Sequence, residues 1–347
     1  MTASPTGLVG RVDASVRTIA SISRAPAVVL AVIAGDQTAI ACHGNPTPTA
    51  HTVFELGSIT KTFTALLLAE MVAHGKVKYH DLITAYLPPQ AFPRRLPATP
   101  VTLIHLATHT AGFPRLPGKF YLRALPAWWT NPYARYRLDD LYRATARTRP
   151  RHPPGTRMHY SNFGVGLLGQ LLANAASGDY GHLVLDRICR PLGMTDTLTE
   201  AGPSCATGHR NGRPLPTWDM GALAAAGTLR SSAADLLLYL QAHLRPETTP
   251  LAVALQATHI PQVAAKGKDH ICLVWNHRRS RYGDVLFHSG ATRGFTAFIG
   301  FCPQTHTGVA ALVNATPTHR RNMIPTAYAL LKALIREHGT TERRHQW

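Results

Sequence analysis

Acidic residues are scarce in this sequence, and that shortage sets its most visible property. Eighteen Asp and Glu stand against 36 Lys and Arg in 347 residues, so the formal net charge is +18. Only 16% of the residues are charged while 45% are hydrophobic, which excludes a disordered polycation. The basic residues form no run of five like charges and no zinc-finger or RNA-recognition spacing, so we expect no specific nucleic-acid partner.

Cysteine is also rare. The chain has five cysteines, widely separated and without a CxxC pair: Cys42, Cys189, Cys205, Cys272 and Cys302. An odd number at such spacing excludes a disulfide framework and a metal knuckle. We therefore predict buried, reduced thiols.

Long apolar runs are missing. No stretch of about 18 apolar residues is present, so the sequence predicts no membrane span. The first apolar run, residues 25–34, is followed by Gly35 and Asp36, which are typical of a tight turn. We interpret the run as the first strand of a hairpin and not as the core of a signal peptide, and on that basis expect a cytoplasmic protein.

Hydrophobic patterning predicts strands near both chain ends and helices between them. Helices are expected over 5–22, 59–74, 162–175, 233–243 and 322–338, with a short one beginning at 101–106 and ended by Gly112. Strands are expected over 28–34, 38–43, 285–288, 296–301 and 308–314. Residues 91–154 are rich in proline and aromatic side chains, which is typical of an irregular insertion.

This order of elements predicts a mixed α/β fold. An antiparallel sheet built from both chain ends would be flanked by helices. We expect a discontinuous sheet domain, residues 1–85 and 215–347, and an inserted, mainly helical subdomain, residues 86–214. The active site would lie at their interface.

Ser58 and Lys61 form the first candidate motif, within the stretch FELGSITK. Residues three apart share a face of a helix, so the lysine amine can reach the serine hydroxyl. A serine becomes a good nucleophile when a base takes its proton, and lysine can be that base if its pKa is lowered. The helix N-terminus also offers free N–H groups to an oxyanion. The alternative is a helix-capping serine beside a solvated lysine.

Two further motifs follow at spacings of about 100 and 130 residues. Tyr160 and Asn162 precede a glycine-rich apolar helix and could present a phenol and a carboxamide to one pocket. His288 and Gly290 lie on a predicted strand, where the glycine would let a substrate backbone approach closely. The alternatives are a packed tyrosine beside an N-capping asparagine, and a chance histidine on an ordinary strand.

The order SxxK, YxN, HxG resembles the motif order of penicillin-recognising serine enzymes. The chain is similar to the serine β-lactamase-like family, which includes class C β-lactamases, serine D-alanyl-D-alanine carboxypeptidases, D-aminopeptidases, esterases and transacylases. The similarity runs from about residue 27 to 335 and includes FELGSITKTFT (54–64), LIHLATHTAG (103–112), PGTRMHYSNFGVGLL (154–168), Gly193-Met194, AGTLRSSAADL (226–236) and HSGATRGF (288–295). It implies a β-lactamase/transpeptidase-like fold.

The resemblance implies a catalytic role for four residues. Ser58 would be the acylated nucleophile, and Lys61 and Tyr160 together would move its proton. His288 would take the place of the lysine in the family's third motif. No cofactor and no metal is implied, and the His105/His109 pair at i,i+4 would be structural.

The resemblance also implies residues that hold the substrate. Asn162 would bind a substrate amide, and the backbone N–H groups of Ser58 and Ala291 would form an oxyanion hole. Ser289 and Gly290 would lie along the substrate. Arg293, directly after the third motif, is a candidate anchor for a carboxylate.

The third motif reads HSG and not KTG, which casts doubt on β-lactam hydrolysis. We expect an acyl-enzyme catalyst acting on a small-molecule ester or amide, as a hydrolase or esterase, or as an acyltransferase with an amine or alcohol acceptor in a biosynthetic pathway. The alternatives are a D-alanyl-D-alanine carboxypeptidase or β-lactamase, and a non-catalytic binding protein of the same fold.

The proline-rich insertion is strongly basic. From residue 115 to residue 157, ten residues are Arg or Lys, against Asp139 and Asp140: Arg115, Lys119, Arg123, Arg135, Arg137, Arg143, Arg147, Arg149, Arg151 and Arg157. One interpretation is recognition of an anionic substrate or an acidic carrier protein, and the other is a solvated basic face.

Overall fold

The computed structural model describes residues 7–94, 98–118, 120–121, 125, 131–133, 135–265, 267 and 269–344, with side chains through residue 340. Its largest element is an eight-stranded antiparallel sheet in the order β2-β1-β12-β11-β10-β9-β8-β7. The strands are β1 Ala27–Ala34, β2 Gln37–Gly44, β7 Val263–Ala264, β8 Asp269–Ile271, β9 Asn276–Ser280, β10 Gly283–Ala291, β11 Thr296–Cys302 and β12 Thr307–Val313. The predicted α/β sheet built from both chain ends is confirmed, because β1 pairs with β12.

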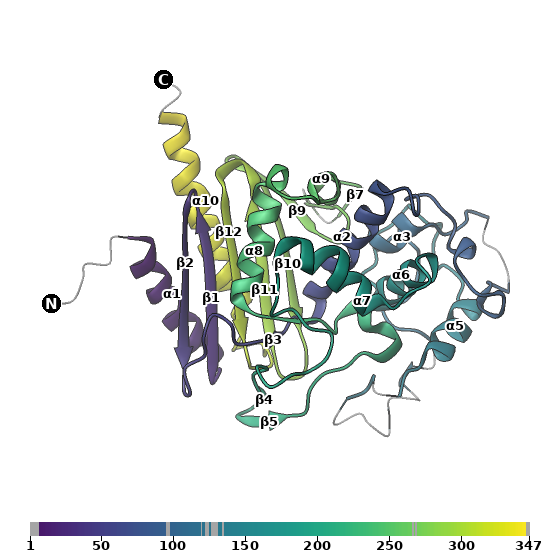
Figure 1. Cartoon of the computed structure of the whole chain (residues 1–347), viewed down its shortest axis with the longest axis horizontal. Helices are drawn as coiled ribbons and strands as arrows, with labels where there is room; N and C mark the ends of the chain where they lie inside the picture. Colours follow the sequence, from purple (N-terminus) through teal and green to yellow (C-terminus); the bar gives the residue numbers. More distant parts are fainter. Residues whose placement is uncertain are drawn as a thin grey trace.

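Helices cover both faces of this sheet. They are α1 Leu8–Ser23, α2 Thr60–Ala73, α3 Leu103–Ala107, α5 Leu138–Arg147, α6 Asn162–Ala175, α7 Tyr180–Val184, α8 Ala233–Leu244, α9 Ala252–His259 and α10 Ile324–Arg344. Figure 1 shows α1 and α10 near one end of the molecule and α3, α5, α6 and α7 gathered at the other. In the part of the chain that is described, no helix has the length and apolar character to cross a membrane.

Strand β1 shows how the sequence produces these layers. All eight of its residues, AVVLAVIA, are buried, as expected for a strand covered on both faces. Val28, Leu30 and Val32 pack with α1 and α10 in one core, whereas Val29, Ala31 and Ile33 belong to the core that contains α2 and α8. The period of two in a strand thus divides one apolar run between two cores. The run after Ala25 is therefore a central strand, and the predicted hairpin with β2 is confirmed.

The proline-rich insertion is more regular than predicted. Its sequence forms α5, a helix that the prediction missed, and α3 ends at Ala107 instead of continuing to Gly112. Helix α5 begins where the Asp140 carboxylate accepts the backbone N–H of Arg137, and it buries Leu141 and Tyr142. The proline and arginine residues of the surrounding segment hid this amphipathic pattern. Lys119 and Arg123 of the basic insertion lie outside the described residues.

All five cysteines are free thiols, as predicted. Cys189, Cys272 and Cys302 are buried, but Cys42 and Cys205 are only partly buried, so the prediction of burial was wrong for these two. Cys42 lies on β2, which is the last strand in the sheet order. A strand with a neighbour on one side only leaves such side chains closer to solvent.

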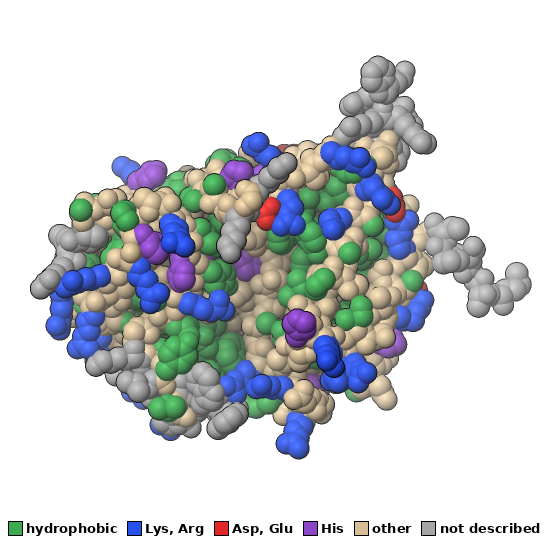
Figure 2. All heavy atoms as spheres, turned by 180° about the vertical axis from the view of Figure 1, so that it is seen from behind, with side chains coloured by type: hydrophobic (Ala, Val, Ile, Leu, Met, Phe, Trp, Pro, Cys, Tyr) green, Lys and Arg blue, Asp and Glu red, His purple; other side chains and the backbone are tan. Residues whose placement is uncertain are grey.

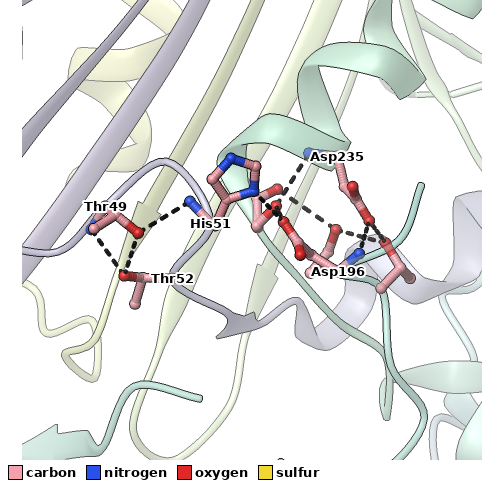
Figure 3. Close-up of polar contacts among 8 residues, drawn as sticks. Thr49, His51, Thr52, Asp196 and Asp235 are labelled. Atoms are coloured by element: carbon pink, nitrogen blue, oxygen red, sulfur yellow. Dashed lines mark hydrogen bonds and ion pairs between the residues drawn. The ribbon is translucent and has the colours of Figure 1, made fainter. Parts of the chain in front are cut away.

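A polar network holds the start of α8 against the loop that precedes the candidate site (Figure 3). The hydroxyl of Ser232 caps α8 by accepting the Asp235 N–H at 3.1 Å and donates to Asp196 at 2.8 Å. Buried Asp235 accepts the Asp196 N–H at 2.9 Å, and the His51 ring lies 2.8 Å from the Asp196 carboxylate. The residues before Ser232 form β6 (Arg230–Ser231), which pairs with β3 (Phe54–Glu55). The network therefore fixes the strand that leads into Ser58.

Candidate active site

Ser58 lies in a 3₁₀ turn, Gly57–Ile59, between β3 and α2. Its Oγ is 2.9 Å from Lys61 Nζ and 2.7 Å from the phenolic oxygen of Tyr160. The predicted contact between residues three apart is therefore present. The first N–H groups of such a turn have no partner within the helix, so the amide of Ser58 is available to a ligand.

Lys61 is completely buried beneath Ser58. Its amine also donates to the carbonyl of Ala226. Burial, and secondarily the positive charge of Arg115, lowers the pKa of Lys61 well below its usual value. A lysine in this state can exist as a neutral amine whose lone pair accepts a proton.

The ring of Tyr160 is surrounded by basic groups. Lys61 Nζ lies 5.1 Å and Arg115 Cζ 5.2 Å from its centroid, and the ring of His109 packs against it at 4.6 Å. Burial raises the pKa of Tyr160, while its hydrogen bond to Ser58 and the charge of Arg115 act in the opposite direction. Because burial is the largest effect, the phenol keeps its proton and donates it to Ser58 Oγ, and Arg115 is the cation that favours its ionisation.

The residue after Tyr160 positions the second motif. Ser161, not Asn162, is the N-cap of α6: its Oγ accepts the Gly164 N–H at 2.8 Å and donates to Pro114 O at 2.7 Å. The backbone N–H of Asn162 donates to Arg115 O at 3.0 Å. The side-chain oxygen of Asn162 is buried, without a hydrogen-bond partner in the described chain.

His288 lies on β10 and is only 4% exposed. Its Nδ1 is 2.9 Å from the carbonyl of Ser289, and burial, followed by the charge of Lys61, lowers its pKa to about 3. His288 is thus a neutral imidazole at pH 7, unlike the lysine found at this position in KTG motifs.

Two glycines let β10 approach the serine turn. A Cβ on Gly290 would lie 2.0 Å from Leu56 O and 2.9 Å from Ser58 N, and one on Gly57 would lie 2.8 Å from Ala291 N. The missing side chain of Gly290 therefore makes room for the serine turn, whereas the sequence predicted room for a substrate backbone. This close approach brings the backbone N–H groups of Ser58 and Ala291 near each other.

These groups surround a cavity of about 320 Å³. Six predicted site residues line it: Ser58, Tyr160, His288, Ser289, Gly290 and Ala291. Its other lining residues are His109, Arg115, Met158, Ile271, Val274, Asn276 and Ile324. Among the described residues, Lys61, Asn162 and Arg293 do not line this cavity. A second cavity, of about 410 Å³, is lined by none of the predicted site residues.

Sequence reasoning did not assign His109 and Val274 to the site. Both have left-handed backbone conformations, with φ of +59° and +67°. Such a φ is unusual for any residue with a side chain and strained for a β-branched one. The Val274 N–H donates to Ala107 O at 2.8 Å, and His109 O accepts the His159 N–H at 2.8 Å, which holds these conformations in place. No local sequence signal marks Val274, because its placement depends on contact with α3.

Positive charge extends over the surface of the molecule. The face in Figure 2 carries many Lys and Arg side chains and few Asp and Glu side chains. Across the described residues, no group of three or more His, Cys, Asp or Glu side chains is arranged to hold a metal ion.

Comparisons with known proteins agree with this geometry. The model of the Beta-lactamase family matches residues 12–333. The D-alanyl-D-alanine-carboxypeptidase/endopeptidase AmpH of Escherichia coli (strain K12) is 29% identical over 331 residues, which cover 87% of this chain and 83% of that protein. The beta-lactamase of the same organism is 26% identical over 325 residues, covering 82% and 81%. The human putative beta-lactamase-like 1 is 27% identical over 316 residues, covering 83% of this chain and 59% of that protein. The chain belongs to the Beta-lactamase family.

Proposed function

We propose that this chain is a serine acyl-enzyme catalyst that cleaves an ester or amide of a small molecule. The observation that carries the proposal is the position of Ser58 Oγ, within hydrogen-bond distance of both a buried lysine amine and a tyrosine hydroxyl. A serine with two such partners can lose its proton as it attacks. A non-catalytic binding protein of the same fold would not require this arrangement.

In the acylation step, Ser58 Oγ bonds to the substrate carbonyl carbon and its proton passes to the Lys61–Tyr160 pair. The bond to the leaving oxygen or nitrogen then breaks, and the leaving group takes a proton from the same pair. Water or another nucleophile next attacks the acyl carbon and gives a proton to the pair, the bond between that carbon and Ser58 Oγ breaks, and the serine hydroxyl regains its proton from the pair. Because the two groups are coupled, the proton belongs to the pair and not to either residue alone.

The N–H groups of Ser58 and Ala291 would stabilise the negative oxygen that forms on the carbonyl. Both residues line the cavity, and the Gly57 and Gly290 contacts bring their backbones together. Removing one such donor typically slows an enzyme roughly a hundred- to a thousandfold. Asn162 would contribute its carboxamide to a substrate amide only if the side chain turns toward the cavity.

Hydrolysis is the reaction that the relatives favour, because they are named as a carboxypeptidase/endopeptidase and as beta-lactamases. A D-alanyl-D-alanine peptide or a β-lactam is therefore the alternative substrate class. The neutral His288 weighs against the β-lactam, since it cannot supply the permanent charge of a third-motif lysine. Transfer of the acyl group to an amine or alcohol remains our second candidate, because acyl-Ser58 would be open to any nucleophile that enters the cavity.

Burst kinetics test this proposal. An activated p-nitrophenyl ester should release a first equivalent of nitrophenol per enzyme quickly and the rest slowly, as acyl-Ser58 accumulates. If the acyl group is transferred, added amines should yield an amide product in place of the free acid. A D-alanyl-D-alanine dipeptide and a β-lactam, run beside the ester, rank the substrate classes. Turnover without an acyl intermediate, or no reaction with any ester, amide or β-lactam, would contradict the proposal.

A further inference from the structure

We propose that a group of basic side chains beside the cavity binds a multiply charged anion, such as a phosphate or phosphonate, carried by the substrate. This group, which we call the basic rim, consists of Arg115, Arg151, His152, Arg157 and His159. The inference rests on the proposed function, since it concerns how a substrate of Ser58 is held. It assigns a substrate class and not a further reaction.

The rim residues lie close together although they come from two segments. The charges of Arg151, His152, Arg157 and Arg115 all act on His159 and, after burial, lower its pKa. The rings of His152 and His159 have their centroids 6.5 Å apart. Arg115 reaches from the rim into the cavity, because it is also one of the lining residues beside Ser58 and Tyr160.

Backbone hydrogen bonds hold the two segments together. The Arg151 N–H donates to Gly112 O at 2.8 Å, and the Gly155 N–H donates to Thr110 O at 3.0 Å. A Cβ on Gly112 would lie 2.7 Å from His152 O, so the backbones of the two segments are in direct contact. The rim therefore stands on a fixed frame, which lowers the entropy lost when a ligand is bound.

The three arginines of the rim are exposed and have no carboxylate partner within the described chain. Other arginines do form such pairs, among them Arg11, Arg143, Arg187, Arg190, Arg245 and Arg278. Like charges held close together repel one another and destabilise the fold unless an anion joins them. A guanidinium offers donors in a planar fork that matches carboxylate and phosphate oxygens.

The number of cations favours a multiply charged ligand. One carboxylate can form a bidentate pair with one arginine, whereas a phosphate has enough charge and oxygen atoms for two or three. With the anion at the rim and Arg115 at the border of the cavity, the reacting carbonyl would extend toward Ser58. Among the described residues that line the cavity, Arg115 is the one with a permanent charge, because His288 is neutral.

Three p-nitrophenyl esters of equal chain length test the inference, with a terminal methyl, carboxylate or phosphonate group. The wild-type enzyme should prefer the phosphonate ester over the methyl ester in kcat/KM. The double variant R151Q/R157Q should lower this preference by roughly ten- to a hundredfold, as expected when charge-assisted hydrogen bonds are lost. The double variant R17Q/R213Q is the matched control, because it removes the same net charge at exposed positions away from the cavity lining.

Absence of a preference in the wild type, or an equal loss in both double variants, overturns the inference. The measurements are made at low salt and at 0.15 M salt, since long-range steering fades with ionic strength and direct contacts fade less. If the wild type forms acyl-Ser58 from the methyl ester but ignores the phosphonate, only the inference fails. If no ester forms acyl-Ser58, the proposed function itself fails.

Discussion

At the scale of single residues, the burial of Lys61 decides what the serine can do. A charged lysine would hold its proton and could not activate Ser58. Complete burial removes the solvation that stabilises the ammonium form, and the nearby charge of Arg115 acts in the same direction. The buried position is thus the physical origin of a base at neutral pH.

This burial predicts the pH dependence of the reaction. Because the pKa of Lys61 is lowered, kcat/KM should rise with pH and reach its plateau well below pH 10.5, the ordinary pKa of a lysine. Lys61→Ala should lower kcat/KM by roughly 10²- to 10⁴-fold and remove this rise. The check is a pH–rate profile of the ester reaction.

His288→Gln provides the control for that profile. The pKa of His288 is about 3, so the residue is already neutral throughout the range measured. Its replacement should change the rate without moving the rising limb. If kcat/KM of the wild type instead rises near pH 6.5, and this rise is absent in His288→Gln, then His288 and not the Lys61–Tyr160 pair controls activity.

Spacing along the chain predicted only the contact between Ser58 and Lys61, while the other site residues were expected from the resemblance of the motif order to a known family. Ser58 and Lys61 meet because a helix brings residues three apart to one face. Arg115 and Val274 line the same cavity, but they arrive there through tertiary contacts of α6 and α3 that no local pattern encodes. Arg293 was singled out by its proximity to the third motif, yet the described cavity is lined without it.

At the scale of secondary structure elements, the contact between β10 and the serine turn shapes the cavity. Gly290→Ala should push these backbones apart, because its Cβ would lie 2.0 Å from Leu56 O. We expect the stability to fall by about 1–3 kcal/mol and the ester activity to be nearly lost. Gly178→Ala is the control, since its nearest neighbours would be 3.8 Å away. Equal activities for the two variants, measured beside their urea midpoints, would contradict this role of Gly290.

Substitutions at two helix-capping serines distinguish effects on stability from effects on activity. Ser161 caps α6 and also bonds to Pro114, while Ser232 caps α8 away from the cavity. Replacing either serine by alanine should cost about 1 kcal/mol of stability. Only Ser161→Ala should also slow the ester reaction, because Tyr160 and Asn162 flank it. A similar rate loss in Ser232→Ala would mean that general destabilisation explains both.

Prediction of elements succeeded where apolar periodicity was strong and failed in the insertion. Helix α6 spans Asn162–Ala175, as its apolar pattern predicts. Helix α5 was missed because the segment around it is rich in proline and arginine, and its buried face is clear only against the neighbouring elements. Packing thus supplied what local composition did not.

At the scale of the whole molecule, the pairing of β1 with β12 joins the two ends of the chain. The sequence predicted this arrangement because apolar strands occurred near both ends and helices between them. The division into residues 1–85 with 215–347 and an inserted subdomain 86–214 stays a prediction. So does the cytoplasmic location.

Buried histidines predict that acid weakens the whole fold. Burial lowers the pKa of His109 and His243 well below the usual value, that of His259 to about 4 and that of His288 to about 3. Between these lowered pKa values and pH 6.5, the unfolded chain therefore binds more protons than the folded chain does. Stability is fully present above pH 6.5 and falls as the pH drops, by up to about 1.4 kcal/mol per pH unit for each histidine.

Urea unfolding at pH 7.5, 6 and 5 measures this loss. His259→Gln should reduce the pH dependence, whereas His182→Gln, at a side chain that is 83% exposed, should leave it unchanged. Equal midpoints at pH 7.5 and pH 5 in the wild type would contradict the account of these buried rings.

The central claim is that Ser58 carries the acyl group. Intact-protein mass spectrometry after brief exposure to an activated ester tests it most directly. The account predicts one acyl mass increment on the wild-type chain, located by peptide mapping at Ser58, and none on Ser58→Ala. An increment that persists in Ser58→Ala, or ester turnover by the wild type with no trapped adduct at Ser58, would contradict it.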